Sequence, residues 1–471
     1  MTSATNGSKK ESTLESTLKP IDFNDFRDAV LKGLKQKEIE KLPKPSAIGT
    51  TFRSLDEVAP AADHKPKEVG WNFLINRNDP QRDEIINAIR PLAEHRGLKA
   101  DHKPFYFGDE PQKEWERLLN DYMKVAKYIL IIGSPNQVPL KFQSYLSTML
   151  FVGRVDFDYN IENLKKYVQK VISIEKSDET FVNKEVLFFA TNHIAPKGGC
   201  PDPTFYKYFH IEKPLAAKVR ETESNGEYFK ANEDLVEEKA TKDRLLAAVK
   251  TSKPCILIVT SQGLSLPNES EQVQRKLTGA IRCHGNLDED FEKWLFTADD
   301  IRYDQPFLQG GIFIEHADCG YGAPAQSSYN WLEDLEELGF PPKFAEEDFI
   351  SAIPKKLIFH PKGPLAFIGH IDIALFLSTK DGEAFVEEHW EKRVRPISDA
   401  LVEMMHGMPV GYALKHMGAL RSRLNVDIIK KQKTQPADPT EGEFSKEIID
   451  KRLRSTEAEN YMIFGDPAAH A

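Results

Sequence analysis

Short apolar runs alternate with segments of helical spacing through most of the chain. The apolar runs predict buried strands at residues 71–75, 128–132 and 152–156. Apolar positions three and four residues apart predict helices at residues 80–96, 115–127 and 160–177. Because strands that alternate with helices usually pair in parallel, this part of the chain predicts an α/β unit, which we place at residues 23–180.

The alternation of apolar runs with segments of helical spacing continues in the next two hundred residues. Apolar runs predict strands at residues 186–190, 256–260, 311–316 and 365–369. Helical spacing predicts helices at residues 211–223 and 240–250. We therefore expect a second α/β subdomain with a parallel sheet at residues 181–380.

The two ends of the chain differ from this pattern. Residues 1–22 are rich in Ser, Thr, Lys and Glu, which predicts a disordered tail, and a helix is expected to follow at residues 23–41. The pattern at residues 381–471 predicts a helical C-terminal region with a polar, Pro-containing linker at 430–443. Residues 460–467 predict a short strand that ends in a turn and docks on an edge of the sheet.

Composition narrows the class of protein. With 40% hydrophobic residues and no apolar run of membrane-spanning length in the sequence, we expect no membrane association. A net charge of -10 without a basic stripe disfavours nucleic acid as a partner. The four cysteines show no CxxC spacing, which favours a reducing, cytoplasmic location with neither disulfides nor a zinc site. The sequence contains neither GxxxxGK[ST] nor GxGxxG, so we expect no nucleotide and no other cofactor.

Two of the predicted strands end in small and reactive residues. The strand at 256–260 runs into Ser261-Gln262-Gly263, and the strand at 311–316 runs into Ala317-Asp318-Cys319-Gly320. A parallel sheet presents reactive side chains at the carboxyl ends of its strands. These two turns are therefore the candidate site.

The two strand ends resemble the catalytic frame of caspase/gingipain-like (CHAT-like) cysteine peptidases, in which the first strand ends in His-Gly and the second in Ala-Cys. Further segments resemble this family in the family's order, at residues 131–139, 152–154, 363–372 and 459–467. The resemblance implies two side-by-side α/β subdomains and a His-Cys dyad that hydrolyses peptide bonds through an acyl-enzyme. A cysteine attacks as its thiolate, so the histidine takes or holds the thiol proton.

This chain departs from the family pattern at both catalytic positions. Gln262 stands where the histidine is expected, and glutamine does not titrate, so it is no general base. An ungapped match places Asp318 at the cysteine and Cys319 one residue later. A one-residue bulge would bring Cys319 into the nucleophile position, with His316 or another imidazole as its partner. The alternative is that Cys319 is an inert residue of the turn.

Three further residues are candidates for substrate binding. The resemblance implies that the backbone amide of Gly263 stabilises the oxyanion of the acyl-transfer intermediate. Glu315, together with Asp318, is a candidate for an acidic cleft that reads a basic substrate residue, and the alternative is ordinary solvated charge. His370 matches a family histidine at a strand end near the cleft, and its alternative role is a structural hydrogen bond.

These features favour a non-catalytic module that binds a protein or peptide, or regulates one, through a degenerate peptidase centre. The alternative is an active cysteine endopeptidase that uses Cys319 with a non-standard imidazole. A nucleotide-dependent enzyme on a Rossmann-type sheet lacks its Gly-rich fingerprint. The oligomeric state stays open.

Overall fold

The structure is a computed structural model that describes residues 65–99, 101–177, 184–192, 204, 207–224, 229–251, 256–285, 291–331, 343–374, 387–433 and 443–470. The predicted tail at 1–22, the helix at 23–41, Cys200 and Cys255 lie outside these residues. In the described part of the chain, no helix is both long enough and apolar enough to cross a membrane.

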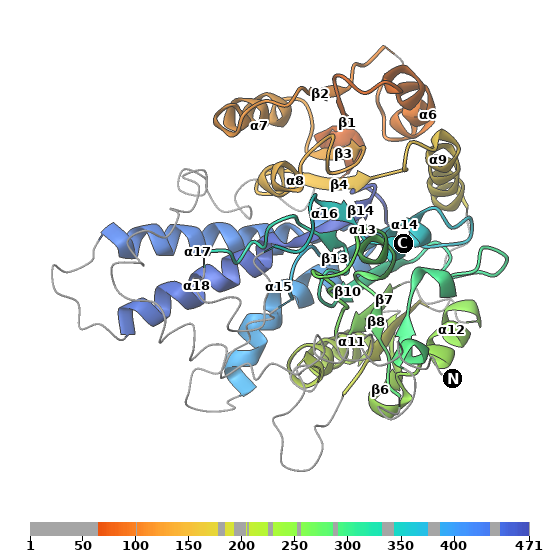
Figure 1. Ribbon diagram of the computed structural model, residues 1–471, viewed down its shortest axis with the longest axis vertical. Helices are drawn as coiled ribbons and strands as arrows, with labels where there is room; N and C mark the ends of the chain where they lie inside the picture. The colour runs from red at the N-terminus through yellow and green to blue at the C-terminus, as the bar shows by residue number, and fades with distance from the viewer. Residues whose placement is uncertain are drawn as a thin grey trace, which may run out of the picture.

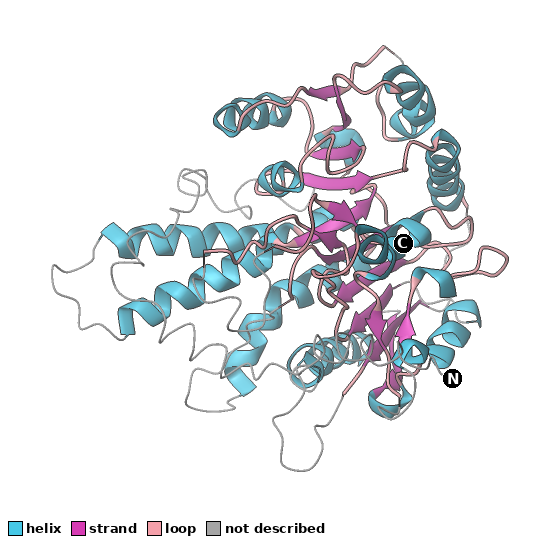
Figure 2. Cartoon of the chain, viewed as in Figure 1, coloured by secondary structure: helices cyan, strands magenta, loops and turns pink. Residues whose placement is uncertain are grey.

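A ten-stranded sheet forms the centre of the molecule and runs from top to bottom in Figure 2. Its strands are, in spatial order, β2 (Phe105–Phe107), β1 (Trp71–Asn76), β3 (Tyr128–Ile132), β4 (Phe151–Val155), β14 (Tyr461–Gly465), β13 (Ala366–His370), β10 (Ile312–His316), β7 (Ile256–Thr260), β5 (Lys184–Ala190) and β6 (Phe229–Val236). Eight of its nine strand pairs are parallel, and the pair β13–β14 is antiparallel. The predicted α/β class with parallel pairing is confirmed.

Helices cover both faces of the first half of the sheet. They are α6 (Arg82–His95), α7 (Trp115–Met123), α8 (Leu140–Leu146) and α9 (Ile161–Lys176). Phe73 and Ile75 of β1 point toward α6 and α9, whereas Leu74 points toward α7 and α8, as the alternation of a strand requires. The Asn160 side chain accepts two backbone N–H bonds at the start of α9, which explains why this helix begins where the sequence predicts.

The second half of the sheet is covered in the same way. A π-helical turn η3 (Tyr208–Glu212) and α11 (Lys213–Ser224) lie on one face, and α12 (Lys242–Thr251) and α14 (Ala352–Ile358) lie on the other. The other short helices are α5 (Pro66–Val69), α13 (Glu271–Leu277) and the 3-10 turns η2 (Gln112–Glu114), η4 (Glu237–Lys239), η5 (Phe291–Trp294) and η6 (Ala298–Asp300). Two-stranded ribbons form from β8 (Ile281–Arg282) with β9 (Leu295–Phe296) and from β11 (Gly322–Ala323) with β12 (Phe349–Ile350).

The C-terminal helices are α15 (Glu387–Met405), α16 (Val410–Ala413), α17 (Lys415–Lys433) and α18 (Glu443–Glu459). In Figure 1, α17 and α18 pack along each other and extend to the left of the sheet. Buried residues of α15 and α17, such as Leu401 and Met417, pack on the α11 face of the second half of the sheet. The predicted linker at 430–443 is wrong at both ends, because α17 continues through Lys433 and α18 begins at Glu443.

The last strand, β14, lies in the middle of the sheet between β4 and β13. The prediction that this segment docks on a sheet edge is therefore wrong. The strand runs parallel to β4 and antiparallel to β13, so it joins two halves whose strands point in opposite directions. The predicted boundary between subdomains at residues 180/181 stays a prediction.

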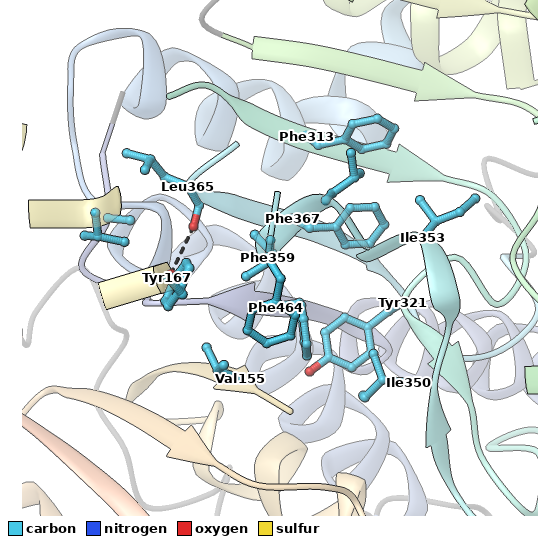
Figure 3. Close-up of a cluster of buried hydrophobic side chains, with 14 of the residues drawn as sticks. Val155, Tyr167, Phe313, Tyr321, Ile350, Ile353, Phe359, Leu365, Phe367 and Phe464 are labelled. Carbon is cyan, nitrogen blue, oxygen red and sulfur yellow. Dashed lines mark hydrogen bonds between the residues drawn. The ribbon is translucent and has the colours of Figure 1, made fainter. Parts of the chain in front are cut away.

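A buried aromatic cluster continues across this junction (Figure 3). Phe313 of β10 stacks on Phe367 of β13, and Tyr321 meets Phe464 of β14 edge to face. Tyr167 of α9 donates a hydrogen bond of 3.0 Å to the carbonyl of Leu365, as the dashed line in Figure 3 marks. The two halves thus share one core.

Candidate active site

The carboxyl ends of β7, β10 and β13 lie at one edge of the sheet, because these three strands are parallel and in register. Thr260 pairs with His316 in this register, and His370 pairs with Tyr461 of β14. This edge holds all the residues to which the sequence gives a site role: Gln262, Gly263, Glu315, His316, Asp318, Cys319 and His370.

The turns after β7 and β10 touch through their backbones. A Cβ atom on Gly263 would overlap the backbone of Asp318, so only glycine allows this approach. Gly263 also forms an antiparallel bridge with Ile281, in which the backbone groups of its neighbours Gln262 and Leu264 make the hydrogen bonds. The bridge therefore leaves the amide of Gly263 out of its bonding.

Cys319 is held in a left-handed backbone conformation, with φ at 54°. Its backbone N–H donates to the carbonyl of Asp372 at 2.9 Å, and its carbonyl accepts the Ser351 hydroxyl at 2.8 Å. The residue is fully buried. Burial, followed by the charges of Asp372 and Asp318, raises the pKa of the Cys319 thiol well above its ordinary value and outweighs the opposing effect of the Ser265 hydroxyl. The thiol is therefore protonated at neutral pH.

Gln262 occupies the position where the resembled family has its histidine, and its side chain is half-buried. Its amide oxygen accepts a hydrogen bond of 3.1 Å from the guanidinium of Arg282. Its carbonyl also accepts the backbone N–H of Arg282 at 3.0 Å. Gln262 is thus tied to the β8 ribbon.

His316 points to the α15 side of the sheet. Its Nδ1 atom lies 2.9 Å from the hydroxyl of Tyr461, and its Nε2 atom has no hydrogen-bond partner among the described residues. Burial, followed by the charge of Lys207 and the neighbouring His370, lowers the pKa of His316 to about 3. The imidazole is therefore neutral at physiological pH.

His370 is also fully buried. Its Nδ1 atom lies 2.9 Å from the carbonyl oxygen of Asp372, and its Nε2 atom lies 3.6 Å from a carboxylate oxygen of Glu457 in α18. Within the described residues, neither His316 nor His370 forms a hydrogen bond to the thiol of Cys319. The structure therefore brings the predicted residues to one edge, where neither of these two imidazoles bonds to the Cys319 thiol.

The two acidic candidates have different environments. Glu315 is fully buried, and neither of its carboxyl oxygens has a hydrogen-bond partner among the described residues. Burial, followed by nearby Asp318, raises the pKa of Glu315 well above its ordinary value, although Lys207 opposes this rise. Asp318 is partly exposed, accepts the N–H of Ala374 at 2.8 Å and lies 3.7 Å from the ammonium of Lys207. Glu315 therefore faces the protein interior rather than an open acidic cleft.

Several polar residues outside the predicted site set complete this edge. Lys207, the N-cap residue of η3, donates to the carbonyl of Ser261 at 3.1 Å. The Asp372 carboxylate accepts hydrogen bonds from the backbone N–H groups of Ile373 and Ser328 and from the Ser327 hydroxyl. Burial raises the pKa of Asp372 to about 6. Tyr461 lies in the segment 459–467 that resembles the family, so that resemblance could have pointed to it. Lys207 carried no signal in the sequence.

The described residues contain no group of three or more His, Cys, Asp or Glu side chains placed to hold a metal ion. At this edge lie the protonated thiol of Cys319, the neutral imidazole of His316, the imidazole of His370 beside the Asp372 carbonyl, the Gln262 amide and the carboxyl groups of Glu315 and Asp318. Hydrolysis through a cysteine requires a thiolate and a base within reach of it.

No family model matches the sequence, and no curated protein matches it. The chain is similar to two solved structures. One, described as "Structure of Protease", has 10% sequence identity and a TM-score of 0.46, and the match covers 85% of this chain and 78% of that chain. The other, described as "Complex of Porphyromonas gingivalis RgpB pro- and mature domains", has 13% identity and a TM-score of 0.45 over 85% of this chain and 80% of that chain.

Proposed function

We propose that this chain is a caspase/gingipain-like (CHAT-like) protein with a degenerate cysteine-peptidase centre, which acts as a protein-binding or regulatory module. The environment of Cys319 carries the proposal. Its thiol is fully buried, its pKa is raised, and neither described imidazole at the sheet edge bonds to it. The motifs that resemble the family, in the family's order, support the same scaffold.

The resemblance also suggests the class of partner. The resembled family recognises polypeptide chains at the carboxyl edge of this sheet, so we take a protein or peptide as the partner. Loss of the dyad removes the chemistry and leaves the scaffold, because Gln262 is bonded to Arg282 and does not titrate.

Thiol labelling tests the proposal directly. We expect a peptidyl probe directed at catalytic thiols, and iodoacetamide at pH 7.5, to leave Cys319 unmodified in the folded protein and to modify it after unfolding in urea. Peptide mapping by mass spectrometry locates the label. Cys283 is also buried, and burial raises its thiol pKa to about 12, so it is the matched internal control.

The alternative is an active endopeptidase that uses Cys319. Rapid labelling of Cys319 in the folded protein, together with turnover of a polypeptide that disappears in Cys319→Ala and persists in Cys283→Ala, would establish that alternative. We expect neither result.

A reconstruction experiment tests the scaffold separately from the chemistry. The Gln262→His and Asp318→Cys substitutions place the family's two residue types on turns whose backbones touch. We expect the double variant to react with iodoacetamide at pH 7 at least about tenfold faster than Asp318→Cys alone, because an adjacent imidazole stabilises a thiolate. Equal rates for the single and double variants would contradict the proposed kinship of this edge with a peptidase centre.

A further inference from the structure

The segment Ser327–Tyr329, which we call the strap, is bonded to the turn that follows β13. The Asp372 carboxylate of this turn accepts the backbone N–H of Ser328 at 2.5 Å and the Ser327 hydroxyl at 3.1 Å. The strap is also braced within itself, because the backbone N–H of Tyr329 donates to the Ser327 hydroxyl at 3.1 Å. Ser327, Tyr329 and Asp372 are all buried, so these bonds lie in the protein interior.

The strap is fixed to the end of α18 as well. The Tyr329 hydroxyl donates to the Glu457 carboxylate at 2.9 Å, and the Ser328 hydroxyl donates to the side-chain oxygen of Asn460 at 3.0 Å. Glu457 and Asn460 are buried. The carbonyl of Asn460 in turn accepts the backbone N–H of Ile371 at 3.1 Å. The end of α18, the strap and the segment after β13 are therefore one hydrogen-bonded unit.

Asp372 connects this unit to the candidate site. Its carbonyl accepts the backbone N–H of Cys319 at 2.9 Å. Burial is the main cause of the raised pKa of the Cys319 thiol, and the charge of Asp372 is the next, which places the carboxylate near the thiol. Two residues after Asp372, the backbone N–H of Ala374 donates to the Asp318 side chain at 2.8 Å. The segment after β13 thus holds both Asp318 and Cys319.

Release of the strap would change the environment of Asp372. Among the described residues, its carboxylate would keep only the backbone N–H of Ile373 and would lose the donors from Ser327 and Ser328. A buried carboxylate that loses its donors is unfavourable, so Asp372 would have to reach water. Because the carbonyl of the same residue holds Cys319, this movement would also open the Cys319 turn.

We propose that the strap is an autoinhibitory contact. While it is bonded to α18 and to Asp372 it keeps the Cys319 turn closed, and its release opens this edge of the sheet to a polypeptide. The inference rests on the proposed function, because the edge that the strap closes is the one to which we assign polypeptide binding. It concerns access to the edge and requires no chemistry at Cys319.

Thiol labelling of the folded full-length protein measures how often the turn opens. The protein is incubated with iodoacetamide for hours, and peptide mapping gives the labelling rates of Cys319 and Cys283. Tyr329→Phe removes the bond to Glu457, and Ser327→Ala removes a bond to Asp372. We expect each variant to raise the ratio of the Cys319 rate to the Cys283 rate by about tenfold, since each loses a hydrogen bond to a charged group. Unfolding of the whole chain would instead raise both rates together.

Tyr122→Phe is the matched control. It also removes the hydroxyl of a buried tyrosine, which donates to the carbonyl of Tyr106 at 3.0 Å in the first half of the sheet. We expect it to leave the ratio unchanged. If Tyr329→Phe and Ser327→Ala give the same ratio as Tyr122→Phe, the strap does not hold the turn and the proposal fails. The strap is judged by this ratio and the proposed function by turnover of a polypeptide, so each can fail without the other.

Discussion

Gly263 is the residue at which the two strand-end turns meet, and its missing side chain is what permits the contact with Asp318. We expect Gly263→Ala to lower the free energy of unfolding by roughly 2 kcal/mol or more, because the new methyl group would overlap backbone atoms, which cannot rotate away as a side chain can. Urea unfolding measures this loss.

Gly108→Ala is the matched control for that substitution. A Cβ atom there meets the end of the flexible Arg77 side chain at 3.0 Å, which can move, so we expect a change within about 0.5 kcal/mol. Similar losses of unfolding free energy in both variants would show that the contact between Gly263 and Asp318 does not cause the loss in Gly263→Ala.

Glu212 gives a prediction for pH dependence. It is fully buried, and one of its carboxyl oxygens accepts the Thr260 hydroxyl at 2.6 Å. Burial raises the pKa of Glu212 from 4.5 to about 8. The folded protein therefore holds this proton more tightly than the unfolded chain does, and the resulting stability is present below pH 4.5 and is lost as the pH rises toward 8.

Glu212→Gln mimics the protonated acid and removes this titration. We expect the variant to match the unmodified protein in stability at about pH 4.5 and to exceed it by roughly 3 kcal/mol at pH 7.5, where deprotonation penalises the acid. Urea midpoints at several pH values measure the difference. Glu221→Gln in α11 is the control, because the Glu221 side chain is 61% exposed. A pH-independent difference for Glu212→Gln would contradict the assigned pKa.

Sequence reasoning identified the residues of the candidate site that follow the two strands, and it missed those that arrive from elsewhere. Gln262, Asp318 and Cys319 were visible because they directly follow apolar runs. Lys207 and Glu212 reach the same edge from the two ends of η3, some 45 to 50 residues before β7 along the chain. A local sequence pattern carries no information on contacts between residues that are distant in the sequence.

Among the elements, the segment after β14 is fixed by charged side chains. Asp466 accepts the indole N–H of Trp71 at 2.9 Å and pairs with Arg96 at 2.7 Å, and all three side chains are buried. Arg96 also pairs with Glu175 of α9. The turn after β14 is thereby held to β1, α6 and α9.

We expect Asp466→Ala to cost about 3 to 5 kcal/mol of unfolding free energy, because it leaves the Arg96 guanidinium buried with one partner fewer. Chemical denaturation provides the measurement. The exposed pair Arg302–Asp304 is the control, and Asp304→Ala should change stability by less than about 1 kcal/mol. Equal effects of the two substitutions would mean that the Asp466 ion pair does not fix the strand.

The position of β14 also shows where sequence patterns stop being informative about elements. Residues 460–467 read correctly as a strand, because apolar residues follow one another and a turn closes them. The pattern contains no information on which strands are its neighbours, and a terminal segment most simply adds to an edge. The strand β6 was missed because only Phe229 and Leu235 are buried and its other residues are partly or fully exposed, so it has no apolar run.

At the scale of the whole molecule, β14, the last described strand of the chain, joins the two halves of the sheet. The carboxyl ends of β1, β3, β4 and those of β7, β10, β13 consequently lie at opposite edges. The candidate site therefore belongs to the second half. From the first half, the Gln143 side chain donates a hydrogen bond of 3.2 Å to the hydroxyl of Tyr321, two residues after Cys319.

This junction predicts how the molecule opens. Gly153 of β4 packs against the backbone of Gly465, and a Cβ atom at position 153 would overlap the carbonyl oxygen of Gly465. We expect Gly153→Ala to loosen β14 from β4, so that the two halves no longer open together.

Hydrogen exchange followed by mass spectrometry in low urea measures this, with peptides from β3 reporting on the first half and peptides from β7 on the second. In the unmodified protein both sets should show one opening free energy, because the shared core links them. In Gly153→Ala the values should separate by more than about 1 kcal/mol. If β3 and β7 lose protection together in the variant, the strand is not what couples the halves.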